Sequence, residues 1–283
     1  MKAQICKNYF STPVGKFTTI NDSNLINDCS ELQNFLTKCK DKKFQKYLLN
    51  NKNATVLKNS RSTLALIYKF SDNSQFFIKI YRRTNLKYQF RYLLRQSRAQ
   101  KSFNVGQILI QNNIFTPAPI LAIEQRKFNL LKFSAVVNEV AEDTMTCNSL
   151  FEELAKKFNS TFFDEFLAKS LQIIAQFHQQ NLIHGDLKIS NLYYLKNNKQ
   201  LKVGIWDFDG TTIKKHALKT SEREKDICRF VASIVDGLIK NDIYVDENEL
   251  FFKINDFYRK SSGEIKFDIA RQKQYIKKLK KIV

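Results

Sequence analysis

The stretch from His184 to Asn191, with the sequence His-Gly-Asp-Leu-Lys-Ile-Ser-Asn, constrains this chain most, together with Asp207 sixteen positions further on. Asp186 is suited to accept the proton of an attacking hydroxyl. Asn191 and Asp207 carry the oxygen atoms that Mg²⁺ prefers as ligands. Because Asp186 and Asn191 lie five positions apart in a short loop, they can face one pocket from opposite ends. The motif therefore predicts phosphoryl transfer from ATP, with Mg²⁺ held by Asn191 and Asp207.

The residues around this motif predict the elements that would position it. Residues 171–178 have apolar side chains at three-to-four spacing, which indicates a helix that leads directly into the loop. Residues 192–195 and 201–206 are typical of two short strands, and the polar residues 197–199 form the turn between them. We expect this hairpin to return Asp207 to the neighbourhood of Asp186 and Asn191.

This arrangement resembles the protein-kinase-like superfamily, and within it the bacterial lipopolysaccharide core kinases that phosphorylate Kdo or heptose. The resemblance implies an α+β, bilobal protein-kinase-like fold, with a small β-rich N-lobe over residues 51–140 and a mainly helical C-lobe over residues 141–283. Residues 1–50 are expected to form an N-terminal extension of unknown role. The matching segments are residues 57–63, 77–81, 114–119, 184–191 with Asp207, and 223–229.

The resemblance also implies which residues bind the nucleotide. Lys79 ends an alternating apolar stretch typical of a strand, and it would contact the α- and β-phosphates. No glycine occurs between Ala54 and Lys79, so the phosphate cover would be Ser60, Arg61 and Ser62, with side-chain donors added to those of the backbone. The assigned nucleotide site also includes Glu139 and Val140.

Further roles follow for the residues around Asp186. Lys188 can reach the transferred phosphoryl group and neutralise its developing charge, so it is assigned to catalysis with Asp186. His184 is interpreted as a structural residue that holds the loop through hydrogen bonds. Asp226 resembles the helix carboxylate that accepts backbone hydrogen bonds from the catalytic loop in kinase folds. His178 and His216 receive no role.

The segment from Tyr81 to Ile123 contains no Asp or Glu, so the usual glutamate partner of the strand lysine is missing. Gln100 or a carboxylate from elsewhere could position Lys79, or the lysine could contact the phosphates or Asp207 directly. The same segment is expected to form one helix over residues 86–112. Its basic face would be either solvated or a binding stripe for phosphate or anionic glycolipid. The residues of this face are Lys87, Arg91, Arg95, Arg98 and Lys101.

Composition favours an anionic partner. The 283-residue chain has a net charge of +20 and is 43% hydrophobic, which indicates a globular protein. There is no apolar run near the length of a membrane span and no signal-peptide pattern, so a cytoplasmic location is expected. Residues 275–283 place apolar residues opposite lysines, as in a final helix packed on the large lobe or one lying on an anionic membrane surface. The five cysteines are expected to be reduced.

The acceptor is inferred from a missing segment. Only about fourteen residues separate Asp207 from the helix expected near Glu222, and no proline follows Pro119, so a platform for a peptide substrate is not expected. A sugar hydroxyl fits better, and the resemblance implies which one: Kdo or heptose of the lipopolysaccharide inner core, or a lipid A-linked sugar. We therefore expect an enzyme peripheral to the cytoplasmic face of the inner membrane, without an obligate protein partner and with little reason to bind nucleic acid.

Three alternatives remain open at this level. A compact RIO-like kinase linked to RNA or tRNA modification would share the catalytic motif and the basic charge. The string from Asp207 to Thr211 also matches the nucleophile motif of haloacid-dehalogenase-type phosphatases. That alternative leaves the residues from His184 to Asn191 without a purpose. A pseudokinase would lack a catalytic residue, and Lys79, Asp186, Asn191 and Asp207 are all present.

Overall fold

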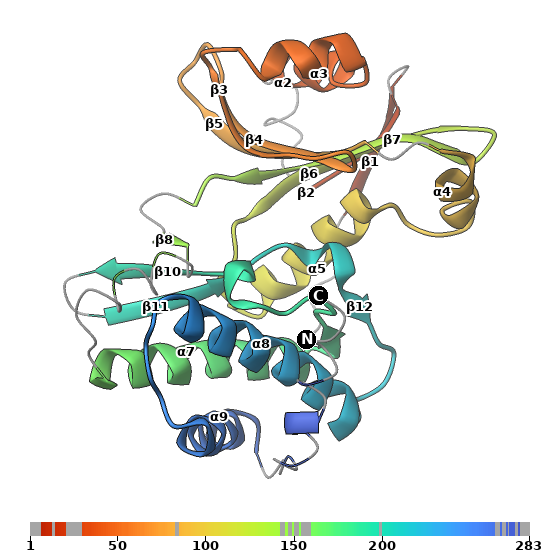
Figure 1. Cartoon of the computed structure of the whole chain (residues 1–283). Coiled ribbons are helices and arrows are strands. Elements are labelled where there is room, and N and C mark those ends of the chain that lie inside the picture. Colours follow the sequence, from red (N-terminus) through yellow and green to blue (C-terminus); the bar gives the residue numbers. More distant parts are fainter. Residues whose placement is uncertain are drawn as a thin grey trace. The chain divides into compact units, whose positions relative to one another are not determined.

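The chain divides into two compact units, which are described separately. Unit 1 comprises residues 1–107 and 117–141, and unit 2 comprises residues 108–116 and 142–283. Unit 1 is built on a large β-sheet, and unit 2 is mainly helical (Figure 1). The computed structural model describes residues 7–12, 15–20, 30–82, 85–141, 145–146, 149, 153, 160–197, 200–263, 267, 270, 272–274 and 277.

Unit 1 contains a seven-stranded antiparallel sheet with the strand order β1-β2-β6-β7-β5-β4-β3. Its strands alternate between the two faces, so that Ile78 and Ile80 point to one face and Lys79 and Tyr81 to the other. The strands are β1 (Lys7–Thr12), β2 (Gly15–Ile20), β3 (Ala54–Asn59), β4 (Thr63–Lys69), β5 (Gln75–Tyr81), β6 (Pro119–Lys127) and β7 (Leu130–Glu139).

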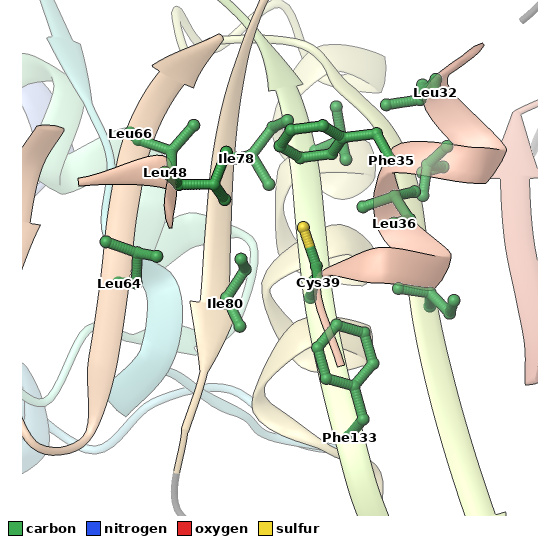
Figure 2. Close-up of a cluster of buried hydrophobic side chains, with 14 of the residues drawn as sticks. Leu32, Phe35, Leu36, Cys39, Leu48, Leu64, Leu66, Ile78, Ile80 and Phe133 are labelled. Atoms are coloured by element: carbon green, nitrogen blue, oxygen red, sulfur yellow. The ribbon is translucent and has the colours of Figure 1, made fainter. Parts of the chain in front are cut away.

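Helices α2 (Ser30–Lys38) and α3 (Lys42–Leu48) cover the face of Ile78 and Ile80. Figure 2 shows Leu32, Phe35 and Leu36 of α2 directed at this face. Burial of such side chains contributes roughly 1.5–3 kcal/mol each. Residues 30–48, within the expected N-terminal extension of residues 1–50, thus contribute to the core of unit 1. The expected boundary also differs at residues 108–116, which are part of unit 2.

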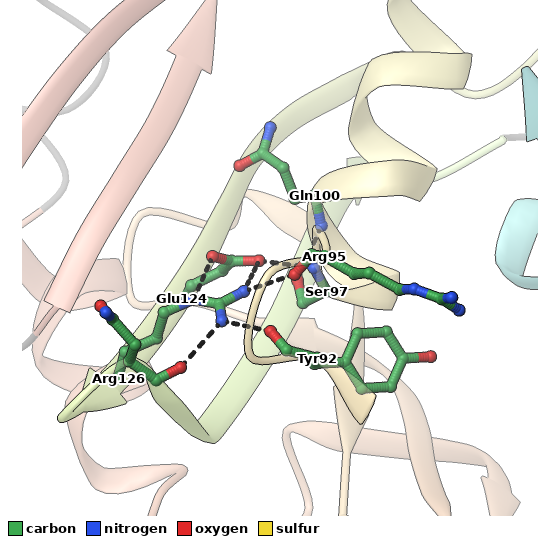
Figure 3. Close-up of polar contacts among 7 residues, drawn as sticks. Tyr92, Arg95, Ser97, Gln100, Glu124 and Arg126 are labelled. Carbon is green, nitrogen blue, oxygen red and sulfur yellow. Dashed lines mark hydrogen bonds and ion pairs between the residues drawn. The ribbon is translucent and has the colours of Figure 1, made fainter. Parts of the chain in front are cut away.

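The prediction of one continuous helix over residues 86–112 is wrong. The structure has α4 (Leu86–Arg91) and α5 (Arg98–Gln111), separated by a turn. In that turn the guanidinium of Arg126 donates to the carbonyls of Tyr92 (2.6 Å) and Arg95 (2.9 Å) (Figure 3). Glu124 accepts the Ser97 N–H at 2.7 Å, and the Ser97 hydroxyl caps α5. These bonds satisfy the backbone outside a helix, so the basic residues do not share one helical face.

In unit 2, α7 (Ser160–Gln179) packs against α9 (Glu247–Ser262) and against β11. Strands β10 (Leu192–Asn197) and β11 (Gln200–Ile205) form the predicted antiparallel hairpin, which β8 (Met145–Thr146) extends. Short strands β9 (Leu182–Ile183) and β12 (Thr212–Ile213) pair separately. Helix α8 (Thr220–Lys240) buries Ile227, Phe230 and Val231. The core of unit 2 therefore surrounds the chain that leads into and out of the predicted loop.

Candidate active site

The predicted catalytic loop is closed by its own neighbours in unit 2. It follows β9 directly, and the chain after Asp207 returns through β12, which pairs with β9. Gly185 adopts a φ of 78°, and a Cβ at this position would lie 2.8 Å from the carbonyl oxygen of Gly210. Any other residue would combine a left-handed conformation with a clash. Gly185 thus allows the two loops to approach each other closely.

Trp206 fastens the hairpin to the catalytic loop through three hydrogen bonds. Its indole Nε1 donates to the Ser190 carbonyl at 3.0 Å, and its backbone N–H donates to the Asn191 carbonyl at 3.1 Å. The Trp206 carbonyl lies 3.0 Å from Nε2 of His184, which is fully buried. The expected structural role of His184 agrees with this bond. The hairpin therefore brings Asp207 to the catalytic loop, as predicted.

Helix α8 supports the loop from the other side. Asp226 accepts the backbone N–H groups of His184 (2.6 Å) and Gly185 (3.0 Å), and Ser233 Oγ accepts that of Ile189 at 2.9 Å. Burial alone raises the pKa of the Asp226 carboxyl, but the interactions with His178, His184 and Gly185 outweigh burial and hold the pKa below its usual value. An ionised carboxylate thus holds two backbone amides of the loop.

His178 completes a buried chain of polar groups behind Asp226. Its Nδ1 lies 2.8 Å from the hydroxyl of Tyr258 on α9, and its Nε2 lies 3.5 Å from a carboxylate oxygen of Asp226. Burial lowers the pKa of His178 in spite of the neighbouring carboxylate. Because the lowered pKa favours the neutral imidazole, we interpret the 3.5 Å approach of Nε2 to Asp226 as a contact and not as an ion pair.

Three residues with predicted roles lie together within the loop. Asp186 is more than half exposed, and its carboxylate pairs with Lys188 Nζ at 3.0 Å. Asn191 is buried, and its side-chain amide donates to the Asp186 carbonyl at 2.7 Å. This bond fixes the amide nitrogen of Asn191 toward the loop, so its Oδ1 is left to accept a cation or a donor. The Asp186–Lys188 pair is exposed, so an incoming substrate can reach it.

Asp207 has a left-handed backbone conformation. Its φ of 63° and ψ of 62° are uncommon for residues other than glycine, although aspartate and asparagine tolerate them better than most. It directly precedes a short 3₁₀ turn, Phe208–Gly210, whose Phe208 is buried beside Phe177 and His184. Such local strain costs roughly 1–3 kcal/mol and persists where surrounding structure enforces it. The carboxylate of Asp207 and Oδ1 of Asn191 suit Mg²⁺, which takes few protein ligands.

The predicted nucleotide residues are all in unit 1. Lys79 is buried on the sheet face that α5 covers, with its Nζ 5.7 Å from the ring centroid of Tyr81. The turn between β3 and β4 holds Ser60, Arg61 and Ser62. The Ser60 hydroxyl donates to the Thr63 carbonyl and accepts the Thr63 N–H, both at 3.1 Å. Ser60 is therefore used to close the turn, and its hydroxyl also lies 3.4 Å from that of Ser62, so Arg61 is the residue of the turn that is most available to phosphate.

Glu139 is the last residue of β7, and Val140 follows it near the end of unit 1. The Glu139 N–H donates to the Ala118 carbonyl at 2.9 Å. Helix α5 contains no carboxylate, and its polar residues include Gln100 and Asn104, which are joined by a 3.2 Å hydrogen bond. Amides thus occupy the helix where protein kinases have a glutamate.

Sequence reasoning missed the roles of Trp206, Ser233 and His178. Trp206 and Ser233 have no motif of their own, although Asp226 and Ser233, seven positions apart, are polar residues on an otherwise apolar face of α8. That pattern could have indicated a helix that binds the loop. The contact of His178 with Tyr258 joins residues 80 positions apart, so no local pattern could reveal it.

The fold and the site define a protein-kinase-like phosphotransferase. The chain belongs to the lipopolysaccharide kinase (Kdo/WaaP) family, whose model matches residues 49–248. The structure of WaaP in complex with acyl carrier protein is similar to 93% of this chain and 98% of that chain, with a TM-score of 0.64 and 12% sequence identity. The resemblance and the fold class predicted from sequence are thereby confirmed.

A second solved structure, the Rio2 kinase complex with ADP, Mg²⁺ and phosphoaspartate from Chaetomium thermophilum, covers 98% of this chain and 77% of that chain. Its TM-score is 0.46 and its identity is 13%. A search of curated proteins finds no match to this chain. Family membership makes the protein a kinase of lipopolysaccharide biosynthesis with ATP as its substrate, so the phosphatase alternative is wrong.

Two expectations about membranes have different outcomes. Among the described residues, no helix has both the length and the apolar character that crossing a membrane requires. The amphipathic helix expected over residues 275–283 lies outside the described residues, except for Lys277. Of the five cysteines, Cys39 and Cys228 are described, and both are buried and outside any disulfide.

Proposed function

We propose that this kinase transfers the γ-phosphoryl group of ATP to a sugar hydroxyl, of Kdo or heptose, in the lipopolysaccharide inner core. The main supporting observation is the convergence of Asp186, Asn191 and the strained Asp207 through the hydrogen bonds of Trp206. Family membership supports the lipopolysaccharide acceptor. The choice of a sugar hydroxyl is supported by the short segment between Asp207 and α8, which begins at Thr220, because a platform for an extended peptide is expected to need a longer segment.

In this proposal Asp186 accepts the proton of the sugar hydroxyl, and the ammonium of Lys188, 3.0 Å away, neutralises charge on the transferred phosphoryl group. Asn191 and Asp207 hold Mg²⁺, which neutralises the nucleotide phosphates when bound. The carboxylate of Asp226 keeps the loop backbone in place through two amides. The exposure of Asp186 allows the acceptor to approach it, whereas Asn191 is buried.

We propose that Lys79 and the turn from Ser60 to Ser62 contact the nucleotide from unit 1. Glu139, the last residue of β7, and Val140 after it are proposed to contact the nucleotide as well. Lys79 is buried and faces α5, so its ammonium is held close to the sheet and is not free in solvent. Arg61 is exposed at the tip of the turn and can pair with phosphate oxygens. Since the Ser60 hydroxyl closes the turn, we expect Ser60 to shape the phosphate site indirectly.

We propose that the enzyme acts at the cytoplasmic face of the inner membrane, where the acceptor lies. The net charge of +20 supports attraction to an anionic surface. We also expect it to act without an obligate protein partner. Because the WaaP structure is a complex with acyl carrier protein, the control is to assay the purified chain with and without that protein. Equal turnover in the two assays supports the expectation, and turnover only with the carrier contradicts it.

Transfer of label from γ-labelled ATP to purified core glycolipid tests the function. We expect label in the glycolipid with the wild-type enzyme and none with Asp207→Ala, because loss of a metal ligand removes charge neutralisation at the phosphates. Mass spectrometry of the core should show one added phosphate and identify the sugar. Label that remains on the protein, or that requires RNA as the acceptor, contradicts the proposed substrate.

A further inference from the structure

Unit 1 contains a cleft of about 920 Å³ that shares Ser60 and Arg61 with the proposed phosphate turn, while its other lining residues have no role in the proposed mechanism. Its walls come from α3, the turn between β3 and β4, α4 and the start of β7. The lining residues include no Asp or Glu. Six lysines and arginines with side chains in the lining make up what we call the basic cleft: Lys40, Lys42, Lys46, Arg61, Arg91 and Lys132.

The walls of the basic cleft are held in place by a seventh basic residue, Arg82. Its Nε donates to Oε1 of Gln45 at 2.9 Å, and its Nη1 donates to the Ser60 carbonyl at 3.0 Å. Gln45 is only 7% exposed and also donates to the Cys39 carbonyl at 2.7 Å. These bonds tie α3 to the β3–β4 turn, so the cleft is formed before any ligand arrives.

The positive charge of the basic cleft is not balanced within the described part of the chain. None of its six cations forms an ion pair there, whereas Lys214, Arg229 and Lys253 of unit 2 each pair with a carboxylate. Lys132 makes a neutral hydrogen bond of 2.8 Å to Gln89. Burial lowers the pKa of Lys40. Like charges gathered in one cleft repel each other, and a bound polyanion removes that cost.

The size and composition of the basic cleft favour a phosphorylated sugar. Its volume lies at the upper end of ligand sites, roughly 300–1,000 Å³, and is far larger than one phosphate requires. Asn59 and Asn85 also line the cleft, and although their Oδ1 atoms accept from Arg82 and from the Tyr88 N–H, their amide N–H groups can donate to sugar hydroxyls. Lys79 does not line the cleft, because it points to the sheet face that α5 covers. The cleft is therefore additional to the proposed nucleotide contact of Lys79.

Helix α4 links the basic cleft to a lipid source for this sugar. Tyr88 and Arg91 line the cleft, whereas Leu86 and Phe90, four positions apart, share another face and are 66% and 63% exposed. Exposed apolar side chains on a helix that also carries basic residues are typical of segments that lie on anionic membranes. A soluble sugar phosphate would give these two side chains no role.

We propose that the basic cleft binds the phosphorylated sugar headgroup of an anionic glycolipid, while Leu86 and Phe90 enter its acyl layer. This inference rests on the proposed lipopolysaccharide acceptor and adds a second recognition point for it in unit 1. The cleft recognises phosphate that is already on the glycolipid. Its contribution is to bind the acceptor, and the transfer itself does not require it.

A charge-matched pair of double variants tests the basic cleft. Lys42→Gln with Lys46→Gln removes two exposed cations of the cleft, and Lys58→Gln with Lys69→Gln removes two exposed cations of unit 1 outside it. We expect calorimetry with inorganic pyrophosphate to show roughly 3- to 20-fold weaker binding for the cleft variant only. Equal affinities for the two variants would overturn the proposal, since net charge alone would then explain binding.

Vesicles test the lipid source. Vesicles of phosphatidylcholine containing bisphosphorylated lipid A should sediment with the wild-type protein, and those containing dephosphorylated lipid A should not. The substitution pair Leu86→Ser and Phe90→Ser should reduce vesicle binding and leave pyrophosphate binding unchanged. Leu57→Ser, at an exposed apolar position outside α4, is the control. Equal sedimentation with both lipids, or no effect of the α4 pair, would contradict glycolipid binding.

The Asp186→Asn enzyme separates this inference from the proposed function. If the variant binds pyrophosphate and vesicles through the cleft while wild-type enzyme fails to label core glycolipid, the proposed acceptor is wrong and the cleft remains a phosphate site. If wild-type enzyme labels the glycolipid while the cleft and control variants bind equally, the cleft proposal is wrong and the kinase assignment remains.

Discussion

The catalytic loop of unit 2 and the basic cleft of unit 1 handle charge in opposite ways. Around the loop, Asp186 pairs with Lys188, and Asp226 is bound by Arg229 at 3.3 Å and by two backbone amides. In the cleft, six cations have no carboxylate partner among the described residues. Paired charges hold a fixed geometry, as catalysis requires, whereas unpaired cations are available to a ligand. Substitutions should therefore act sharply in unit 2 and gradually in the cleft.

The largest effect is expected at Asp186. If its carboxylate positions and deprotonates the acceptor, Asp186→Asn should reduce kcat by roughly 10²–10⁴-fold while ATP affinity changes little. Asp209→Asn, a change of the same kind in the neighbouring 3₁₀ turn, is the matched control and should cost less. Steady-state kinetics with core glycolipid provide the measurement. Near-normal turnover by Asp186→Asn would remove this carboxylate from the mechanism.

The next effect concerns the close contact of the two loops. Gly185→Ala should destabilise unit 2 by roughly 1–3 kcal/mol, because a left-handed alanine is strained and its Cβ would lie 2.8 Å from the Gly210 carbonyl oxygen. Activity should fall with stability, since the same contact aligns Asp186 with the turn after Asp207. Gly263→Ala is informative as a control, because Gly263 also has a positive φ (87°) but has open space around it. The free energies of unfolding of both variants, measured in urea, separate the two causes. Gly263→Ala reports backbone strain alone, and any further loss in Gly185→Ala reports the clash.

The sequence predicted the catalytic loop well because its chemistry is local. The helix, the hairpin, the loop and the support by Asp226 all follow from residues within about 50 positions, and each agrees with the structure. Trp206 was expected as the last residue of the second strand, but β11 ends at Ile205, and Trp206 was given no role because side-chain bonds to carbonyls leave no pattern in sequence.

The sequence predicted unit 1 less well because its structure depends on long-range contacts. The break between α4 and α5 depends on Glu124 and Arg126, which lie about 30 positions beyond the turn that they hold. Residues 30–48 look like an unrelated extension in the sequence, yet Leu36 and Leu48 are fully buried against strands of the sheet. The basic cleft itself combines residues from position 40 to position 132, so only the folded chain reveals it.

Two arginines of unit 1 should differ in a way that sharpens the comparison. Arg82 binds Gln45 and the Ser60 carbonyl, so Arg82→Gln should lower the free energy of unfolding by roughly 1–3 kcal/mol by leaving these groups without a donor. Arg91 is exposed and forms no ion pair with a described residue, so Arg91→Gln should change stability by less than about 0.5 kcal/mol. Chemical denaturation of both variants tests this difference. Equal losses would mean that the cleft cations also hold the fold.

The smallest effect should be the pH dependence of unit 2. Burial lowers the pKa of His178 in the folded state, so the unfolded chain binds a proton that the folded chain does not. Below the unfolded value of about 6.5, stability should therefore fall as pH decreases toward the folded pKa. Each kcal/mol of unfolding free energy corresponds to roughly 2–4 °C in Tm for a protein of this size.

His178→Gln should flatten the dependence of Tm on pH between 7 and 5.5, although it lowers Tm at pH 7 by removing the contact with Tyr258. His216→Gln, at an exposed position, should leave the dependence unchanged. If Tm of His178→Gln depends on pH as strongly as that of the wild type, another titrating group is responsible. The buried contacts of His178 with Asp226 and Tyr258 would then not respond to pH in this range.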